Sequence, residues 1–218
     1  MRKMDLAQEV LALKLLNAGV VKFGAFKLKL HETQPEAPLS PIYINLRTPD
    51  NKDGPLTVDL VENIGWQLFN ITNKERIEFD LVAGIPRAGE PFAEVVSRWS
   101  GKPLIKLGKK VEGDKRKIDA IVSGRYQSGQ RILLVDDLIT QADTKKEAIN
   151  VCRGAGLDVV GVVVLLDREQ GGSEELKKMG YDLFSAFTLT ALLDYYVLMR
   201  EIEPALRLQV MNYLANNR

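Results

Sequence analysis

The chain has 218 residues, enough for one α/β domain that buries its core without disulfide support. Thirty Lys and Arg residues nearly balance twenty-nine Asp and Glu residues, so the net charge of +1 gives no overall electrostatic case for binding nucleic acid or a membrane. No apolar stretch reaches membrane-spanning length and no signal region is evident, which predicts a cytoplasmic protein. Cys152 is the only cysteine and lies on a predicted helix, so we expect it to be a buried structural thiol.

The first part of the chain predicts a helix, two extended segments and a second helix. Helical apolar spacing over residues 6–17 stops at Gly19, and residues 20–30 are extended in pattern. Residues 41–46 predict a short strand. Pro55 is suited to the first turn of a helix of about twenty residues, because proline lacks the N–H that such a turn leaves unpaired.

From residue 79 onward the pattern alternates between strands and helices. Continuous Val, Ile and Leu runs are typical of strands that are buried on both faces, which favours a mostly parallel sheet covered by helices on both sides. The strands are predicted at 79–83, 103–106, 132–135, 159–166 and 182–187, and the helices at 90–99, 144–155, 174–179 and 191–199. An amphipathic segment, 204–216, either caps the domain or contacts a second subunit.

The stretch 132–144 carries the strongest functional signal. A buried strand leads into Asp136 and Asp137 and then into a short polar turn and a helix. The first turn of a helix exposes backbone N–H groups that bind phosphate, and two consecutive carboxylates cannot both face the core. A phosphorylated sugar therefore fits this stretch. The alternative is a plain strand, turn and helix with Thr140 or Asp143 as the N-cap.

The same stretch resembles the phosphoribosyl diphosphate (PRPP) motif of type I phosphoribosyltransferases, in which paired acids hold the ribose hydroxyls and the next loop wraps the 5-phosphate. The resemblance assigns PRPP binding to Asp136, Asp137, Thr140, Gln141, Ala142, Asp143 and Thr144. The glycine that family members carry in this loop is replaced here by Ala142. Asp143 adds negative charge that repels a phosphate unless it points outward or is offset by Lys145 or Lys146.

A second candidate site is the strand, turn and helix of residues 81–94. Its turn contains Gly84, Pro86 and Gly89, and such a turn offers backbone donors that suit a diphosphate. Arg87 is positioned to add a charge-assisted contact. The alternative is an ordinary turn with a surface arginine.

A third candidate is the segment 106–117, which has six basic and two acidic residues between two predicted strands. Its charge and its scarcity of apolar groups predict a mobile, exposed loop. Such a loop suits a reaction with a diphosphate leaving group, because it can close over the developing negative charge. A solvated surface loop is the alternative.

Taken together, the motifs resemble those of orotate phosphoribosyltransferases and occur in that family's order: FGAFKLKL, SPIYINLR, EFDLVAG, VSG, VDDLIT, LLDREQGG and FTLTALLDYY. The resemblance implies an α/β type I phosphoribosyltransferase fold with a mostly parallel central sheet, helices on both faces and a small N-terminal hood. It implies one domain over 1–218, with a helix and hood strands in 1–48, the core in 55–200 and a helical tail in 201–218.

The resemblance also assigns residues to the second substrate. It places Lys29 near the orotate and the ribose, and Arg168 on the orotate carboxylate, which a guanidinium recognises in a bidentate manner. The family inserts a basic loop into the neighbouring subunit's site, with lysine as the main catalytic contributor. Lys109 and Lys110 match the start of that loop, and its other basic positions are approximated by Lys115, Arg116 and Lys117.

Some positions depart from the family pattern. The basic loop has no histidine, and Ala88 stands where many members have a lysine. Leu30 and His31 replace the Ser-Gly that follows the family's early lysine, and an inserted stretch then runs to Leu39. His31, the sole histidine, is therefore expected to be neither catalytic nor a metal ligand.

The predicted reaction is transfer of phosphoribose from PRPP to orotate, giving orotidine 5'-monophosphate and diphosphate in pyrimidine synthesis. Asp136 and Asp137 are expected to stabilise a cationic ribose and the basic loop to stabilise the diphosphate. Mg²⁺ is expected to be carried mainly by that diphosphate, with no metal ligands in the chain, and the family implies a homodimer. Two alternatives stay open: transfer to another base, and a catalytically silent regulator that binds PRPP or a nucleotide.

Overall fold

The computed structural model describes residues 4–32, 34–50, 54–112 and 115–216. These residues fall into two compact units, which are considered one at a time. One unit comprises residues 61–188, and the other comprises residues 1–60 together with 189–218.

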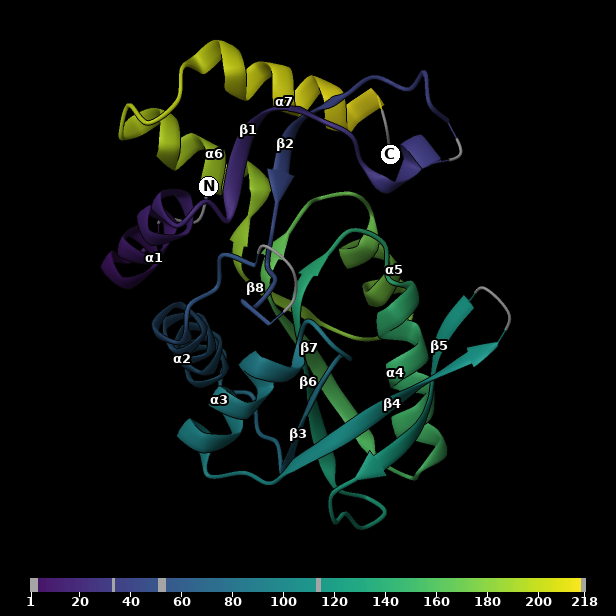
Figure 1. The fold of residues 1–218 in the computed structure, drawn as a ribbon. Helices are drawn as coiled ribbons and strands as arrows, with labels where there is room; N and C mark the ends of the chain where they lie inside the picture. The colour runs from purple at the N-terminus through teal and green to yellow at the C-terminus, as the bar shows by residue number, and fades with distance from the viewer. Residues whose placement is uncertain (1–3, 33, 51–53, 113–114, 217–218) are drawn as a thin grey trace. The chain divides into compact units, whose positions relative to one another are not determined.

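The unit of residues 61–188 is built on a six-stranded sheet with the order β5-β4-β3-β6-β7-β8 (Figure 1). All neighbouring strands are parallel except β5, which pairs antiparallel with β4 at the edge. The strands are β3 (Leu81–Gly84), β4 (Leu104–Glu112), β5 (Lys115–Ser123), β6 (Arg131–Ile139), β7 (Asp158–Asp167) and β8 (Leu183–Thr188). The mostly parallel sheet predicted from the sequence is confirmed.

Helices cover both faces of this sheet, as predicted. They are α3 (Glu90–Ser100), α4 (Asp143–Gly154), α5 (Gly172–Lys178) and the part of α2 (Val58–Lys74) that lies in this unit. In Figure 1, α3 and α4 lie on opposite sides of the sheet. Strand residues that alternate in sequence therefore reach two different apolar layers.

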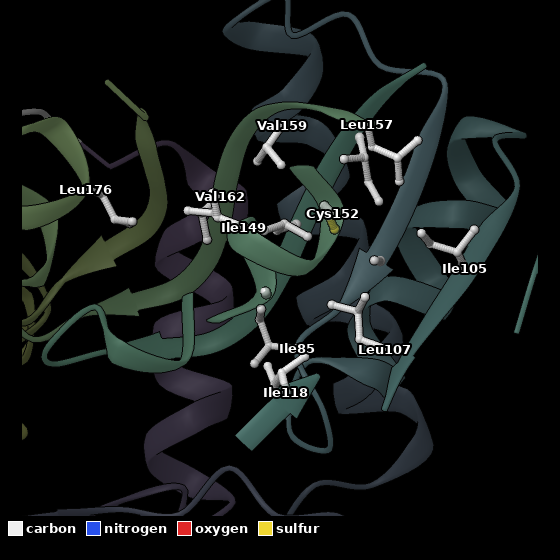
Figure 2. Close-up of a cluster of buried hydrophobic side chains, with 14 of the residues drawn as sticks. Ile85, Ile105, Leu107, Ile118, Ile149, Cys152, Leu157, Val159, Val162 and Leu176 are labelled. Atoms are coloured by element: carbon white, nitrogen blue, oxygen red, sulfur yellow. The ribbon is translucent and has the colours of Figure 1, made fainter. Parts of the chain in front are cut away.

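One of those layers is the cluster of buried side chains in Figure 2. Ile149 and Cys152 of α4 pack in it with Val162 of β7. Cys152 is fully buried, and burial raises the pKa of its thiol to about 12. Its expected role as a structural thiol fits this environment, because a nucleophilic cysteine needs a lowered pKa.

The prediction of an irregular basic loop over residues 106–117 is wrong. Strand β4 continues to Glu112 and β5 starts at Lys115, so the segment forms an antiparallel hairpin. Leu107 and Ile118 are both buried in the apolar layer beneath α4. These two apolar residues give the hairpin a buried side, and this outweighs the loop-like composition of the residues between them.

An ion pair links the start of β3 to the start of β6. Both oxygens of Asp80, just before β3, accept hydrogen bonds from Arg131, the first residue of β6, at 2.9 to 3.2 Å. These bonds lower the pKa of Asp80 from 3.8 to about 2. The carboxylate therefore favours the folded state above its ordinary pKa, and this stabilisation is lost as the pH falls toward 2.

We expect Asp80→Asn to lower the melting temperature at neutral pH. We expect the difference from wild type to shrink as the pH falls from about 4 toward 2, because the carboxylate is protonated first in the unfolded chain and only near pH 2 in the folded protein. Thermal melts of both proteins over a pH series measure this. Asp182→Asn, which changes an exposed aspartate, is the control and should melt like wild type throughout. A difference that stays constant down to the lowest pH would contradict the assigned role.

The second unit contains helices α1 (Leu6–Asn17), α6 (Leu189–Leu198) and α7 (Pro204–Asn216), and the antiparallel strands β1 (Val21–Phe26) and β2 (Ser40–Ile44). A 3₁₀ turn, Lys29–Glu32, follows β1 where an extended chain was predicted. The Tyr196 hydroxyl donates to the Ala12 carbonyl at 2.8 Å, which links α6 to α1. Among the residues described, no helix is both long and apolar enough to cross a membrane.

Helix α2 starts at Val58 and not at Pro55 as predicted. The Thr57 hydroxyl accepts a hydrogen bond from the Leu60 N–H at 3.3 Å, which is the geometry of an N-cap. The cap therefore sets the start of the helix, and Pro55 lies in the preceding loop.

Candidate active site at the carboxyl edge of the sheet

The two neighbouring aspartates lie inside β6 and do not follow it. The strand was predicted to end at Val135, but β6 pairs with β7 as far as Ile139. Asp136 stands opposite Val164 in this register. The acid pair is therefore held by the sheet at its carboxyl edge, where parallel α/β sheets bind their ligands.

The two carboxylates have different environments. Asp136 is 3% exposed, and its Oδ2 lies 2.5 Å from the Nζ of Lys145, which is 4% exposed. The other oxygen of Asp136 accepts a hydrogen bond from the Asp137 N–H at 2.9 Å. Each oxygen of Asp136 thus has a partner within the protein.

Asp137 is only half-buried, and its Oδ1 accepts a hydrogen bond from the Leu138 N–H at 2.7 Å. Burial of the carboxyl raises the pKa of Asp137 well above its ordinary value, the neighbouring Asp136 raises it further, and Lys145 lowers it. The sequence required at least one acid to face solvent, a cation or sugar hydroxyls, and in the structure Asp136 faces the ammonium group of Lys145.

The turn after β6 places no capping side chain of its own at the start of α4, and the Ala142 N–H there donates to the Glu175 carboxylate at 3.4 Å. Ala142 occupies the N-cap position and no side chain there makes a capping hydrogen bond. The alternative prediction of Thr140 or Asp143 as the cap is therefore wrong. The N–H groups of the first helical turn remain without an intrahelical acceptor, and such groups bind phosphate at the positive end of the helix dipole.

Asp143 was expected to repel a phosphate unless its side chain pointed outward or a lysine offset its charge. Its side chain is 78% exposed and its Oδ1 lies 3.8 Å from the Nζ of Lys146. Lys146 also pairs with Glu175 of α5 at 2.7 Å. The negative charge of Asp143 is therefore at the surface beside a cation. Of the other loop residues, Gln141 is exposed, Ala142 is fully buried and Thr144 is partly buried.

The glycine turn between β3 and α3 touches the acid pair through its backbone. A Cβ on Gly89 would lie 2.2 Å from the Val135 carbonyl oxygen and 2.9 Å from the Cα of Asp136. The Ile85 N–H donates to that same Val135 oxygen at 2.8 Å. The turn that the sequence proposed for diphosphate therefore lies against β6, and Arg87 within it is exposed.

A third turn, between β7 and α5, brings Arg168 to the same edge. The Arg168 N–H donates to the Ile139 carbonyl at 3.0 Å, and the Gly172 N–H donates to the Thr140 carbonyl at 2.9 Å. The carboxyl of Asp167 accepts a hydrogen bond from the Glu169 N–H at 2.8 Å. The structure thus brings the backbone of Arg168 next to the turn between β6 and α4.

The basic hairpin leaves the sheet at this edge. Gly84, the last residue of β3, pairs with Lys106, and β4 continues to Glu112. This extension is roughly 20 Å long at the usual rise per residue of a strand. Lys110 stands directly opposite Lys117, so both side chains lie on one face of the hairpin.

The remaining predicted residues belong to the basic hairpin or to the other unit. Lys109 is exposed on the hairpin, whereas the side chains of Lys115 and Arg116 lie outside the described part of the structure, as does that of Lys29. His31 belongs to the other unit, where its Nδ1 accepts from the Leu28 N–H at 2.9 Å and its Nε2 lies 3.0 Å from the Ala37 carbonyl. These bonds indicate that His31 holds a loop together.

Sequence reasoning missed Lys145 as a partner of the acid pair. Its spacing contained the signal, because residues 145, 148, 149 and 152 follow the period of one helical face and the other three positions are apolar. A lysine on the buried face of an amphipathic helix needs an acidic partner. Asp136 is the nearby carboxylate that meets this need.

Comparison with known proteins identifies the family to which this chain belongs. A family model described as the phosphoribosyl transferase domain matches residues 52–191, which include the acid pair, the glycine turn and the basic hairpin. The chain belongs to the phosphoribosyltransferase family. It is 32% identical over 204 residues to the orotate phosphoribosyltransferase of Pyrobaculum islandicum, covering 93% of this chain and 96% of that protein.

Solved structures of phosphoribosyltransferases and related proteins share the fold. The UMP synthase of Leishmania donovani superposes with a TM-score of 0.74 at 30% identity, over 96% of this chain and 42% of that longer chain. The orotate phosphoribosyltransferase of Aeropyrum pernix superposes with a TM-score of 0.67 at 26% identity, over 84% of this chain and 96% of that chain. The type I phosphoribosyltransferase fold predicted from the sequence is therefore confirmed.

Proposed function

We propose that this protein transfers the phosphoribosyl group of PRPP to orotate, giving orotidine 5'-monophosphate and diphosphate in pyrimidine synthesis. The observation that carries the proposal is the combination of Asp137 and the uncapped start of α4 on a single strand, turn and helix. An acid beside a phosphate-binding helix start fits a phosphorylated ribose. The P. islandicum relative, matched over nearly its full length, supports orotate as the base.

The reaction breaks the bond between ribose C1 and the diphosphate and forms a bond from C1 to N1 of orotate. Positive charge develops on the ribose ring while negative charge grows on the diphosphate. In this proposal Asp137 stabilises the ring, the start of α4 holds the 5-phosphate, and the turn from Gly84 to Gly89 faces the diphosphate. Because these groups belong to elements of one sheet, they are positioned before the substrate arrives.

The basic hairpin is proposed to act on the diphosphate. Like charges directly opposite each other destabilise a strand pair, so Lys110 and Lys117 favour binding of an anion beside them. The hairpin projects beyond the sheet edge, which suits a segment that completes the site of a neighbouring subunit. A homodimer, with Lys109, Lys115 and Arg116 in the same hairpin, is therefore part of the proposal, as is a cytoplasmic location.

Mg²⁺ is proposed to reach the site on the diphosphate. No trio of His, Cys, Asp or Glu side chains suited to a metal ion occurs among the described residues. Mg²⁺ usually keeps several waters and binds through substrate phosphates, so it can arrive with PRPP. When bound there, Mg²⁺ supplies positive charge that stabilises the leaving group.

Arg168 is proposed to select the base through its carboxylate. We expect Arg168→Ala to lower kcat/KM for orotate by about 100-fold, because a charge-assisted pair is lost, while PRPP binding changes little. Steady-state kinetics with orotate varied, and calorimetric titration with PRPP, measure the two effects. Arg125→Ala, at an exposed position, is the control and should behave as wild type. Unchanged orotate turnover in Arg168→Ala would contradict the assigned role of Arg168 in binding the orotate carboxylate.

A further inference from the structure

Glu175 of α5 lies at the start of α4, where the proposed function places the 5-phosphate of PRPP. Its Oε2 accepts from the Ala142 N–H at 3.4 Å, and the same oxygen accepts from the ammonium group of Lys146 at 2.7 Å. Ala142 is the N-cap residue of α4, and Lys146 lies one turn further along that helix. One carboxylate oxygen therefore contacts both a backbone donor and a cation that a phosphate would also use.

The backbone of α5 is packed closely against the turn between β6 and α4. The Gly172 N–H donates to the Thr140 carbonyl at 2.9 Å. A Cβ on Gly172 would lie 2.8 Å from that carbonyl oxygen and 2.6 Å from the Cγ1 of Ile139. Glu175 follows Gly172 in the first turn of α5. The backbone of Glu175 is therefore held beside the proposed phosphate site.

The side chain of Glu175 can leave its position at a small cost. It is 39% exposed and that of Lys146 is 35% exposed, and pairs this accessible to water contribute little net stability. The hydrogen bond from Lys146 lowers the pKa of Glu175 below its ordinary value, so the carboxylate is charged at neutral pH. An incoming phosphate therefore meets a negative charge that is weakly held.

A bound phosphate and the present position of this carboxylate exclude each other. A phosphate oxygen that accepts from the Ala142 N–H would lie about 2.9 Å from that nitrogen. The Glu175 Oε2 already lies 3.4 Å from the same nitrogen, so the two negative oxygens would repel each other at contact distance. Displacement of Glu175 would leave Lys146 with Asp143 at 3.8 Å and able to pair with the phosphate.

We propose that Glu175 competes with the 5-phosphate of PRPP for the Ala142 N–H and for Lys146, and so lowers the affinity of this site for phosphate esters. The proposal rests on the proposed function, because it names a residue that sets the affinity of the same PRPP site. In the free protein the carboxylate accepts from both donors. In the complex it turns toward solvent, and Lys146 pairs with the phosphate.

The test is calorimetric titration of PRPP with Mg²⁺, and of inorganic phosphate, into wild type and Glu175→Gln at about 0.05 M salt, where exposed charges are weakly screened. We expect Glu175→Gln to bind both ligands roughly 3- to 10-fold more tightly, because the amide keeps the size of the side chain but carries no charge that repels phosphate or holds Lys146. Glu174→Gln removes the same charge from the neighbouring, exposed position of α5. It is the matched control and should bind both ligands as wild type does.

Two further measurements locate the competition at the proposed donors. Lys146→Met should weaken PRPP binding more in the Glu175→Gln background than in wild type, because the lysine of wild type must first leave Glu175. In amide NMR spectra the Ala142 resonance should shift as phosphate is added, and it should respond at lower phosphate concentration in Glu175→Gln than in wild type. A residue that only stabilises the turn would cause neither effect.

A Glu175→Gln protein that binds PRPP with the affinity of wild type, or more weakly, would overturn the proposal while leaving the proposed function intact. Equal tightening by Glu174→Gln would also overturn it, because the effect would then belong to the general charge of α5. Wild type and Glu175→Gln proteins that both fail to bind PRPP would instead refute the proposed function, and this inference with it.

Discussion

Asp137→Asn is expected to lower kcat/KM for PRPP by roughly 10²- to 10³-fold, the loss typical of removing one preorganised electrostatic group from an active site. Asn keeps the size of the side chain and can still accept from the Leu138 N–H, but it carries no charge to stabilise a cationic ribose. Steady-state assays with orotate, PRPP and Mg²⁺ measure the effect.

The fold should survive this change, since burial makes the charged form of Asp137 unfavourable and the neutral amide relieves that cost. Melting temperatures of the two proteins check this point. Asp119→Asn, at an exposed position on β5, is the matched control and should keep full activity. An Asp137→Asn protein that stays within a few-fold of wild type would rule out the assigned role.

Gly89→Ala is expected to destabilise the fold by about 1 to 3 kcal/mol and to abolish PRPP binding in the protein that still folds. The added methyl group would lie 2.2 Å from the Val135 carbonyl oxygen and 2.8 Å from the Ile85 nitrogen. Both neighbours are backbone atoms of the sheet edge, so the turn itself must move. The movement would separate the proposed diphosphate turn from Asp136.

Chemical denaturation measures the free energy of unfolding of Gly89→Ala, and the melting temperature with and without PRPP measures binding. Gly154→Ala is the matched control, because no atom lies within 4 Å of a Cβ at Gly154. Gly154 ends α4, where alanine is the better helix former, so this variant should be as stable as wild type or slightly more stable. Equal stability of the Gly89 and Gly154 variants would contradict the close packing at Asp136.

Local sequence patterns predicted most elements of the unit formed by residues 61–188. Continuous Val, Ile and Leu runs gave the strands that became β6 and β7, and the apolar face of α4 gave its buried side. The acid pair and the turn after it were singled out for the same reason, because strand, acids, turn and helix are adjacent in sequence. Local information was sufficient for this part of the candidate site.

Features that depend on contacts between distant residues were not predicted. The hairpin of β4 and β5 forms because Leu107 and Ile118 share the apolar layer beneath α4, whereas the charged residues between them resemble a loop. The close approach of Gly89 to Asp136 depends on the β3–β6 pairing. Neither contact is visible in a local pattern.

The partnership of Lys145 with Asp136 shows the same limit at shorter range. Lys145 and Lys146 were both candidates for the counter-charge of Asp143, and in the structure Lys146 takes that position at the surface whereas Lys145 pairs with Asp136. Which of two adjacent lysines turns inward depends on the rotation of α4 against the sheet. The buried face of the helix, with Ala148 and Ile149, decides it.

The substitutions in the phosphate loop bear on the choice between an enzyme and a silent regulator. Ala142 replaces the family's glycine, yet it occupies an N-cap position with ordinary backbone angles, so the loop does not require glycine there. Asp143 is exposed and close to Lys146. Both features are compatible with a functional phosphate site.

The central claim is tested most directly by the consumption of orotate in the presence of PRPP and Mg²⁺. The account predicts steady turnover in which orotidine 5'-monophosphate and diphosphate form in equal amounts, and it predicts that turnover stops when PRPP is omitted. No consumption of orotate, together with a rise in melting temperature on addition of PRPP alone, would contradict the transfer reaction and leave a protein that binds PRPP without using it.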